Sequence, residues 1–175
     1  MFERILDFIV TSWRMLLPWV VVDDFEGGVI LRLGRFNKEL VPGFQWKLPL
    51  ADIPVITSTV ITTMSLRAQT LTTKDDLTIV VAAIVKYRIT DARAYLLDVW
   101  DSADVLNDIT MGAIREIVAA SNYEYLHNRL IEDDVLEMVK KEAGIFGVEV
   151  LKVTFSDLGK VKSLRLIGDT QELKK

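Results

Sequence analysis

The sequence predicts an α+β fold with a β-rich first half and a mixed α/β second half, preceded by an amphipathic helix. Apolar residues recur at three- and four-residue steps over the first 22 residues, which is the period of a helix with one apolar face. Short runs of valine, isoleucine and threonine, separated by glycine and proline, continue to residue 66 and favour small β-sheets. Two long stretches with helical periodicity follow residue 91 and predict the helices of the second half.

The opening 22 residues are expected to contact a membrane. Their polar face carries Asp7 and Arg14, so the uncharged runs are too short for a simple transmembrane span. Asp7 also interrupts the apolar core that a cleaved secretory signal requires. Three structures remain open: a helix in the membrane interface, a segment that enters the bilayer and turns back at Pro18, and a helix packed on the protein's own core. The side chains expected to contact lipid are Phe2, Ile5, Leu6, Ile9, Trp13, Leu16, Leu17 and Trp19.

Short strands are predicted for the next part of the chain. Residues Trp19 to Asp24 and Val29 to Leu33 should pair as a hairpin, because Gly27 and Gly28 between them permit a tight turn. A third short strand is expected from Phe44 to Leu48, after the Pro42-Gly43 turn. The β-branched stretch from Ile53 to Leu66 predicts one further strand, despite a proline near its start.

The clearest strand runs from Leu77 to Ile89. Apolar residues occupy every second position along it, and the middle of the other face is apolar as well. We therefore expect this strand to lie at the centre of a sheet and to be covered on both faces.

Helices and a closing strand are predicted for the remainder. Residues Ser102 to Ala120 carry an inward stripe with helical spacing, and Asp101 is expected to cap the helix. A second helix is expected from Asn128 to Phe146, ending at Gly147. The run from Val148 to Phe155 predicts the last strand. The inward positions are Leu106, Ile109, Ala113, Ile117 and Ala120 in the first helix, and Val135, Val139, Ala143 and Phe146 in the second.

Composition argues against several classes of function. The formal net charge of -4 is unfavourable for nucleic-acid binding, which needs a concentrated basic surface. The chain has no cysteine and one histidine, His127, so thiolate chemistry and a histidine metal cluster are excluded. No serine-hydrolase motif accompanies His127, and Asp75-Asp76 fits a solvated turn. We expect no catalytic residues, no metal and no cofactor.

Several stretches in order resemble the stomatin, prohibitin and flotillin superfamily, also called SPFH or band 7. The resemblance covers roughly residues 20 to 158 and implies an SPFH domain over residues 23–158, after a membrane segment over 1–22 and before a short tail over 159–175. The stretches are EGGVILRLGR (26–35), PGFQWKLPL (42–50), QTLTTKDDLTIVVAAIVKYRITD (69–91), AIREIV (113–118) and GVEVLKVTFSDL (147–158).

The resemblance implies a non-enzymatic, membrane-associated oligomeric scaffold that organises a membrane patch, on the cytoplasmic face and without crossing it. The alternative is a regulatory binding module for a membrane-bound AAA protease or an ion channel. The implied partners are therefore a lipid membrane, further copies of the chain, and an integral membrane protease or channel. The tail shows no sustained heptad repeat, which argues against a large closed cage, while lateral contacts between the domains could make a smaller ring or sheet. The number of copies and the choice between ring and cage stay open.

Overall fold

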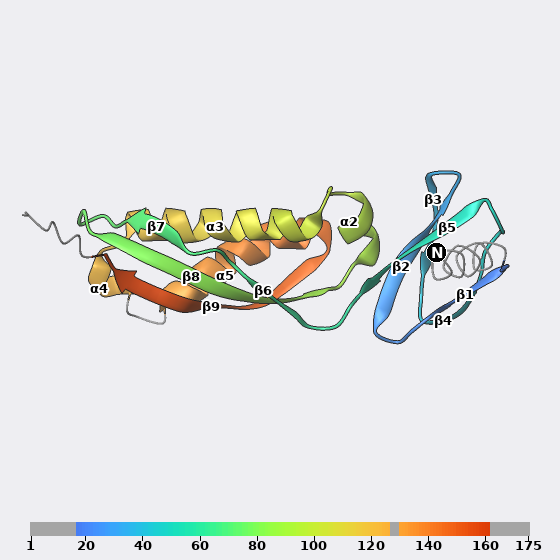
Figure 1. Cartoon of the computed structure of the whole chain (residues 1–175), viewed down its shortest axis with the longest axis horizontal. Coiled ribbons are helices and arrows are strands. Elements are labelled where there is room, and N and C mark those ends of the chain that lie inside the picture. Colours follow the sequence, from blue (N-terminus) through green and yellow to red (C-terminus); the bar gives the residue numbers. More distant parts are fainter. Residues whose placement is uncertain (1–16, 127–129, 162–175) are drawn as a thin grey trace, which may run out of the picture.

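The computed structural model describes residues 17–126 and 130–161. The molecule is elongated, with two parts placed end to end (Figure 1). Strands β1 to β5 form the N-terminal part, and strands β6 to β9 with helices α3 and α5 form the other part. The short helix α2 (Ala92–Leu97) lies where the two parts meet. The predicted α+β class, with a β-rich first half and a mixed second half, is confirmed.

The N-terminal part consists of two small antiparallel sheets. Strand β1 (Trp19–Val22) pairs with β4 (Gly43–Trp46). Strand β2 (Glu26–Arg32) lies between β3 (Arg35–Leu40) and β5 (Asp52–Ser58). One face of each sheet covers a small apolar core made of Val22, Ile30 and Leu40, with Val20 and Ile56 packed against it.

The predicted hairpin between β1 and the following strand is wrong. Strand β1 pairs with β4, and the two glycines lie inside β2 rather than in a turn. A Cβ atom at Gly28 would lie 2.2 Å from the carbonyl oxygen of Val55, so this glycine is required by the close approach of β5. The chain instead turns at residues 23–25, where the Glu26 N–H donates to the Asp23 carbonyl.

The single strand predicted from Ile53 to Leu66 is also wrong. It is divided into β5 and β6 (Thr62–Ser65), which belong to different sheets. The division follows from the pairing, because the Thr59 N–H donates to the Phe25 carbonyl whereas β6 pairs with β8. Pro54 is tolerated because β5 is an edge strand whose only partner in the described structure is β2.

Two glycine-to-alanine substitutions should have opposite effects on stability. Gly28→Ala places a methyl group against the β5 backbone and is expected to lower the free energy of unfolding by about 3 kcal/mol. Gly112→Ala lies in helix α3 with nothing within 4 Å of the new Cβ, so it should raise that free energy by about 1 kcal/mol. Urea unfolding of both variants measures the difference. Equal effects would show that β2 and β5 are not packed this closely.

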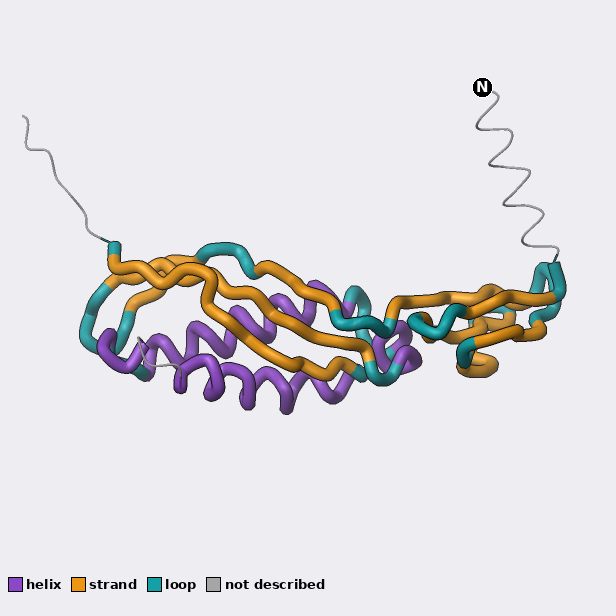
Figure 2. The backbone as a smooth tube through the Cα atoms, turned by 90° about the horizontal axis from the view of Figure 1, so that it is seen from below, coloured by secondary structure: helices purple, strands orange, loops and turns teal. Residues whose placement is uncertain are grey.

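The second part is a sheet with helices on one face. Strand β8 (Thr78–Ile89) pairs with β6 and β7 (Gln69–Thr72) along one edge and with β9 (Val148–Lys160) along the other. Figure 2 shows the helices on one side of these strands. They are α3 (Ser102–Ala120), α4 (Tyr123–Leu126), α5 (Leu130–Ala143) and the 3-10 helix η1 (Gly144–Phe146).

The central position of β8 is confirmed, but its coverage on both faces is not. The side chains that face the helices are buried, and Ile84 on the opposite face is 37% exposed. The helices cover one face only, because α3 and α5 contact each other and pack side by side on that face. The face that carries Ile84 is partly open in the described residues, although its middle is as apolar as a buried face would be.

The predicted helix and strand boundaries of this part agree well with the structure. Helix α3 spans the expected residues, and the Asp101 carboxylate accepts from the Asp104 N–H as an N-cap. Its buried stripe is rotated from the expected one, because Ile114 and Val118 are buried whereas Ala120 is exposed. The expected inward residues of α5 and η1 are all buried. Gly147 ends η1 with a φ of 74°, as predicted, and β9 continues beyond Phe155 to Lys160.

Candidate functional site

Two of the eight side chains predicted to contact lipid lie in the described structure. Leu17 is partly buried next to Pro18, and Trp19 begins strand β1 with its side chain partly exposed. The last four residues of the predicted helical segment are therefore strand, because Val20 and Val22 alternate into the small N-terminal core. The other six, Phe2, Ile5, Leu6, Ile9, Trp13 and Leu16, lie outside the described residues, as do His127 and Asn128.

The outer face of the β1–β4 ribbon is apolar. Trp19 is paired with Trp46, and Val21 with Phe44, so the four side chains share the face that points away from the core. Trp46 is 64% exposed, and the other three are exposed as well. The outward face of a soluble antiparallel ribbon is normally polar, so an exposed apolar face marks a contact surface.

Three aromatic rings on this face form one cluster. The ring centroids of Phe44 and Trp46 lie 5.2 Å apart, and that of Trp19 lies 6.2 Å from Phe44 and 6.4 Å from Trp46. Trp19 and Phe44 are stacked at 28° and Trp46 meets both rings edge-on, and both arrangements are typical of favourable aromatic contacts. The rings therefore support one another as a fixed apolar platform, while large parts of each remain open to solvent.

Two exposed leucines occupy left-handed backbone positions in neighbouring turns. Leu33 and Gly34 form the two-residue turn between β2 and β3, with φ values of 50° and 81°. Leu50, in the β4–β5 loop, has a φ of 65°. The Leu33 N–H donates to the Ala51 carbonyl at 2.9 Å, so the two turns lie side by side. A leucine at such a position costs roughly 1 kcal/mol, and asparagine or glycine is the usual occupant.

Both leucines point an apolar side chain into solvent. Leu33 is 81% exposed and Leu50 is 66% exposed, and Leu48 and Ile53 nearby are exposed too. Backbone strain and exposed apolar area therefore occur together in these two neighbouring turns. We name Leu33, Leu48, Leu50 and Ile53 the leucine tip, and Trp19, Val21, Phe44 and Trp46 the aromatic face.

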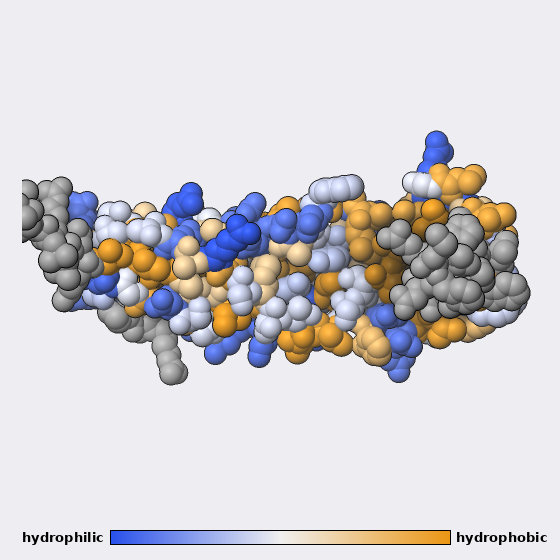
Figure 3. Space-filling model, viewed as in Figure 1, coloured by the Kyte–Doolittle hydropathy of each residue, from blue (hydrophilic) through white to orange (hydrophobic). Residues whose placement is uncertain are grey.

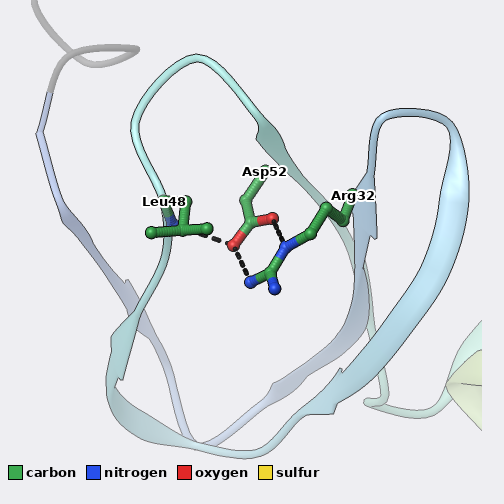
Figure 4. Close-up of polar contacts among 3 residues, drawn as sticks. All are labelled: Arg32, Leu48 and Asp52. Atoms are coloured by element: carbon green, nitrogen blue, oxygen red, sulfur yellow. Dashed lines mark hydrogen bonds and ion pairs between the residues drawn. The ribbon is translucent and has the colours of Figure 1, made fainter.

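An ion pair fixes the shape of the leucine tip (Figure 4). Arg32 Nε donates to Asp52 Oδ1 at 2.7 Å, and Arg32 Nη2 donates to Asp52 Oδ2 at 3.0 Å. The Leu48 N–H donates to the same Oδ2 at 2.8 Å, which ties the β4–β5 loop to the start of β5. The Asp52 side chain is 1% exposed and that of Arg32 is 44% exposed, so the carboxylate depends on these three donors. Asp52 is therefore a positioning residue for the loop that carries Leu48 and Leu50.

Stability should fall in acid because of this carboxylate. The hydrogen bonds from Arg32, with a smaller contribution from the Leu48 N–H, lower the pKa of Asp52 from 3.8 to about 2. A pKa that is lowered by folding stabilises the native state above pH 4, and this stabilisation is lost as the pH falls from about 4 to 2. We expect a loss of about 2 kcal/mol over that window, which is absent in Asp52→Asn. Urea unfolding of both proteins at several pH values measures it; parallel curves would contradict the assignment.

The start of the described chain lies next to the aromatic face, and basic residues occur near both apolar regions in the sequence. The Lys47 N–H donates to the Pro18 carbonyl at 2.9 Å, so Pro18 is held next to the end of β4 and the aromatic face. Between residues 31 and 53 the chain has four basic and two acidic side chains, although its total net charge is -4. Figure 3 shows apolar side chains gathered over the end of the molecule that β1 to β5 form.

Within the described residues, no helix combines the length and hydropathy that crossing a bilayer would require. The same residues contain no group of three or more potential ligands that could hold a metal ion.

The sequence prediction missed most of this surface. Only Trp19 of the aromatic face and none of the leucine tip was predicted. The signal for part of it was present, since Phe44, Trp46 and Leu48 alternate with polar residues in PGFQWKLPL. That alternation predicts an apolar strand face but does not tell whether the face is buried or exposed. Leu33 carried no signal, because the following Gly34 already explained the turn, and no residue next to Leu50 marks its left-handed backbone.

The sequence matches a known protein family over most of its length. Residues 20–163 match the sequence family described as SPFH domain / Band 7 family. An uncharacterised protein of Methanocaldococcus jannaschii is 28% identical over 152 residues, covering 86% of this chain and 76% of that protein.

Two relatives with descriptive names match this chain over a smaller share of their own length. Protein HflK of Vibrio cholerae is 37% identical over 101 residues, covering 57% of this chain and 25% of HflK. A stomatin homolog of Pyrococcus horikoshii is 24% identical over 164 residues, covering 87% of this chain and 60% of the homolog. The chain therefore spans a quarter of HflK and about three fifths of the stomatin homolog.

Proposed function

Because this chain belongs to the SPFH domain / Band 7 family, we propose that it is a non-enzymatic scaffold that several copies assemble on the cytoplasmic face of a membrane. The observation that carries the proposal is the set of exposed apolar side chains of the aromatic face and the leucine tip, both on the N-terminal part of the molecule. Members of this family are typically membrane-associated, and an apolar surface with interfacial tryptophans suits the boundary between headgroups and acyl chains.

We propose three functional regions along the chain. Residues 1–22 attach to the membrane through their apolar side chains, residues 23–158 form the SPFH domain, and residues 159–175 form a short tail. The aromatic face and the leucine tip extend the attachment from the first region into the domain. This arrangement needs no membrane-crossing helix, since each apolar side chain enters only the upper part of one leaflet.

Charge supports contact with an anionic leaflet. In strand β3, which follows the turn that carries Leu33, Arg35 is exposed and Lys38 is partly exposed, whereas Lys47 is buried and Arg32 is paired with Asp52. Each basic residue near an anionic membrane surface contributes about 1 kcal/mol, whereas the more acidic remainder of the chain is repelled from it. The distribution of charge along the chain therefore favours the orientation in which the N-terminal part faces the membrane.

Assembly is expected because one such surface binds weakly. The exposed aromatic and leucine side chains are already partly covered by neighbours, so each gains only part of the roughly 1.5 to 3 kcal/mol of full burial. Several copies that present the surface together become multivalent, and the effective affinity rises by orders of magnitude. We propose that assembly and membrane binding support each other.

The dependence of binding on protein concentration tests this coupling. The full chain is mixed with anionic vesicles over a range of concentrations, and the floated fraction and the particle mass are measured together. We expect the bound fraction to rise steeply at the concentration where oligomers form. Vesicle binding of the monomer as tight as that of the oligomer would contradict the scaffold function.

A regulatory binding module is the second candidate. The resemblance of the chain's motifs to a superfamily that includes such regulators favours it, and the partner would be a membrane-bound AAA protease or an ion channel. Chemical crosslinking in native membranes separates the two functions. Recovery of a single integral membrane protein as the dominant crosslinked species supports the regulatory function, whereas crosslinks mainly between copies of this chain support the scaffold.

A further inference from the structure

A second surface feature lies at the opposite end of the molecule from the leucine tip. An open groove of about 760 Å³ lies between the C-terminal half of α3 and helix α5. Ile117, Ala120 and Met138 form its apolar floor. Its volume is in the range of sites that hold a ligand or a short peptide segment. The groove shares no residue with the aromatic face or the leucine tip.

The rim of the groove on the α5 side carries two carboxylates and one lysine, Lys141. Asp134 and Glu137 line it, and the Tyr125 hydroxyl donates to Asp134 Oδ2 at 2.8 Å. Lys74 lines the groove as well, so its lining contains two acidic and two basic side chains. A segment with apolar side chains and a basic character would match the floor and the α5 rim together.

The described chain ends at the same end of the molecule as this groove. The Val161 N–H donates to the Thr78 carbonyl at 2.9 Å, and the Lys160 ammonium lies 5.9 Å from the Tyr123 ring centroid. The Tyr123 N–H in turn donates to the Asp75 carboxylate at 3.2 Å. Asp75 is adjacent to Lys74, whose N–H donates to the Ser121 carbonyl at 3.0 Å, and both Lys74 and Ser121 line the groove. These contacts connect the end of β9 to the groove edge.

The residues that follow have the composition the groove requires. Leu164, Leu166 and Ile167 are apolar, and Lys162 and Arg165 are basic. Over residues 162–175 there are four basic and two acidic side chains. An extended chain advances about 3.3 to 3.6 Å per residue, so six residues reach about 20 Å from Val161. Reach and apolar content suit the groove, and a basic side chain suits the local pair of carboxylates, Asp134 and Glu137.

We propose that residues 162–175 bind in the groove between α3 and α5 of their own chain. Leu164, Leu166 and Ile167 cover Ile117 and Met138, and Arg165 lies near the carboxylates of the α5 rim. Binding removes the apolar floor from solvent and holds the C-terminal segment against the domain.

Disulfide trapping tests the proposal, since the chain contains no cysteine of its own. The full chain carrying Leu166→Cys and Met138→Cys is oxidised with glutathione disulfide, and the crosslinked species is followed on non-reducing gels and by mass spectrometry. We expect an intramolecular disulfide to form about tenfold faster than in the matched pair Leu166→Cys and Trp100→Cys. Trp100 is 95% exposed just before the first residues of α3, at the end of that helix distant from the groove.

Three further measurements complete the test. The first repeats the trapping with Ala120→Cys in place of Met138→Cys. Ala120 lines the groove but is exposed, so its replacement should not disturb folding. Arg165→Glu should slow the crosslink at least about threefold, because it places a negative charge beside the carboxylates of Asp134 and Glu137. A mixture of chains that each carry one cysteine reports contact between copies. Equal rates for the groove and control pairs, or a crosslink that forms only between chains, would overturn the proposal.

Discussion

Replacing Phe44 and Trp46 together with serine is expected to weaken binding of the full chain to anionic vesicles about a hundredfold. Both side chains are more than half exposed in the free protein and would lose contact with the acyl region. Each contributes roughly 1 to 2 kcal/mol on partial burial, and about 1.4 kcal/mol corresponds to a tenfold change in the equilibrium constant. Flotation with a titration of vesicle concentration measures the change.

The matched control for this variant is Trp100→Ser. Trp100 is more exposed than either aromatic residue, but it precedes α3 at a distance from the aromatic face. Its replacement removes a similar apolar area and should leave vesicle binding unchanged. A similar loss in both variants would show that binding reflects general surface hydrophobicity, and it would contradict a membrane contact located on β1 and β4.

Replacing Leu33 and Leu50 with asparagine should change stability and membrane binding in opposite directions. Both leucines have positive φ values, which asparagine adopts more easily, so the free energy of unfolding should rise by about 1 kcal/mol. Both side chains are also largely exposed, so their apolar contribution to vesicle binding should be lost, and affinity should fall at least about tenfold. Thermal unfolding and flotation of the same preparation measure both effects.

Opposite changes in stability and in vesicle binding distinguish a membrane-contact surface from residues that only stabilise the fold. A core substitution that weakens binding by unfolding the domain lowers stability and affinity together. The leucine tip is expected to behave otherwise, because its leucines contribute strain and exposure to the free protein rather than packing. If the double variant is less stable than the parent, the leucines pack within the fold and the strain argument fails.

The second half of the fold could be predicted from sequence because its elements are long and regular. Strand β8 alternates over twelve residues, and α3 combines nineteen residues of helical period with an aspartate cap, so local pattern and tertiary structure agree. The pattern did not show that helices cover only one face of β8. The apolar middle of its second face, with Ile84 partly exposed, looks the same in a sequence as a buried face.

The first half was less predictable because its strands are short and its glycines have more than one use. Gly28 resembled a turn residue, but its role is to let β5 approach β2, and only the three-dimensional packing shows this. The buried Asp52 had no pattern that linked it to Arg32, twenty residues earlier. The leucine tip depends on that ion pair and on two backbone conformations unusual for leucine, so sequence periodicity could not reveal it.

Tryptophan fluorescence tests the central claim most directly, since the chain contains only four tryptophans. One variant keeps only Trp46 and another keeps only Trp100, with the remaining tryptophans replaced by phenylalanine. Anionic vesicles with brominated acyl chains quench a tryptophan only when it enters the bilayer. We expect the emission of Trp46 to fall by about half and that of Trp100 to stay unchanged. Equal quenching of the two, or no quenching of Trp46 in bound protein, would contradict a membrane-facing aromatic surface.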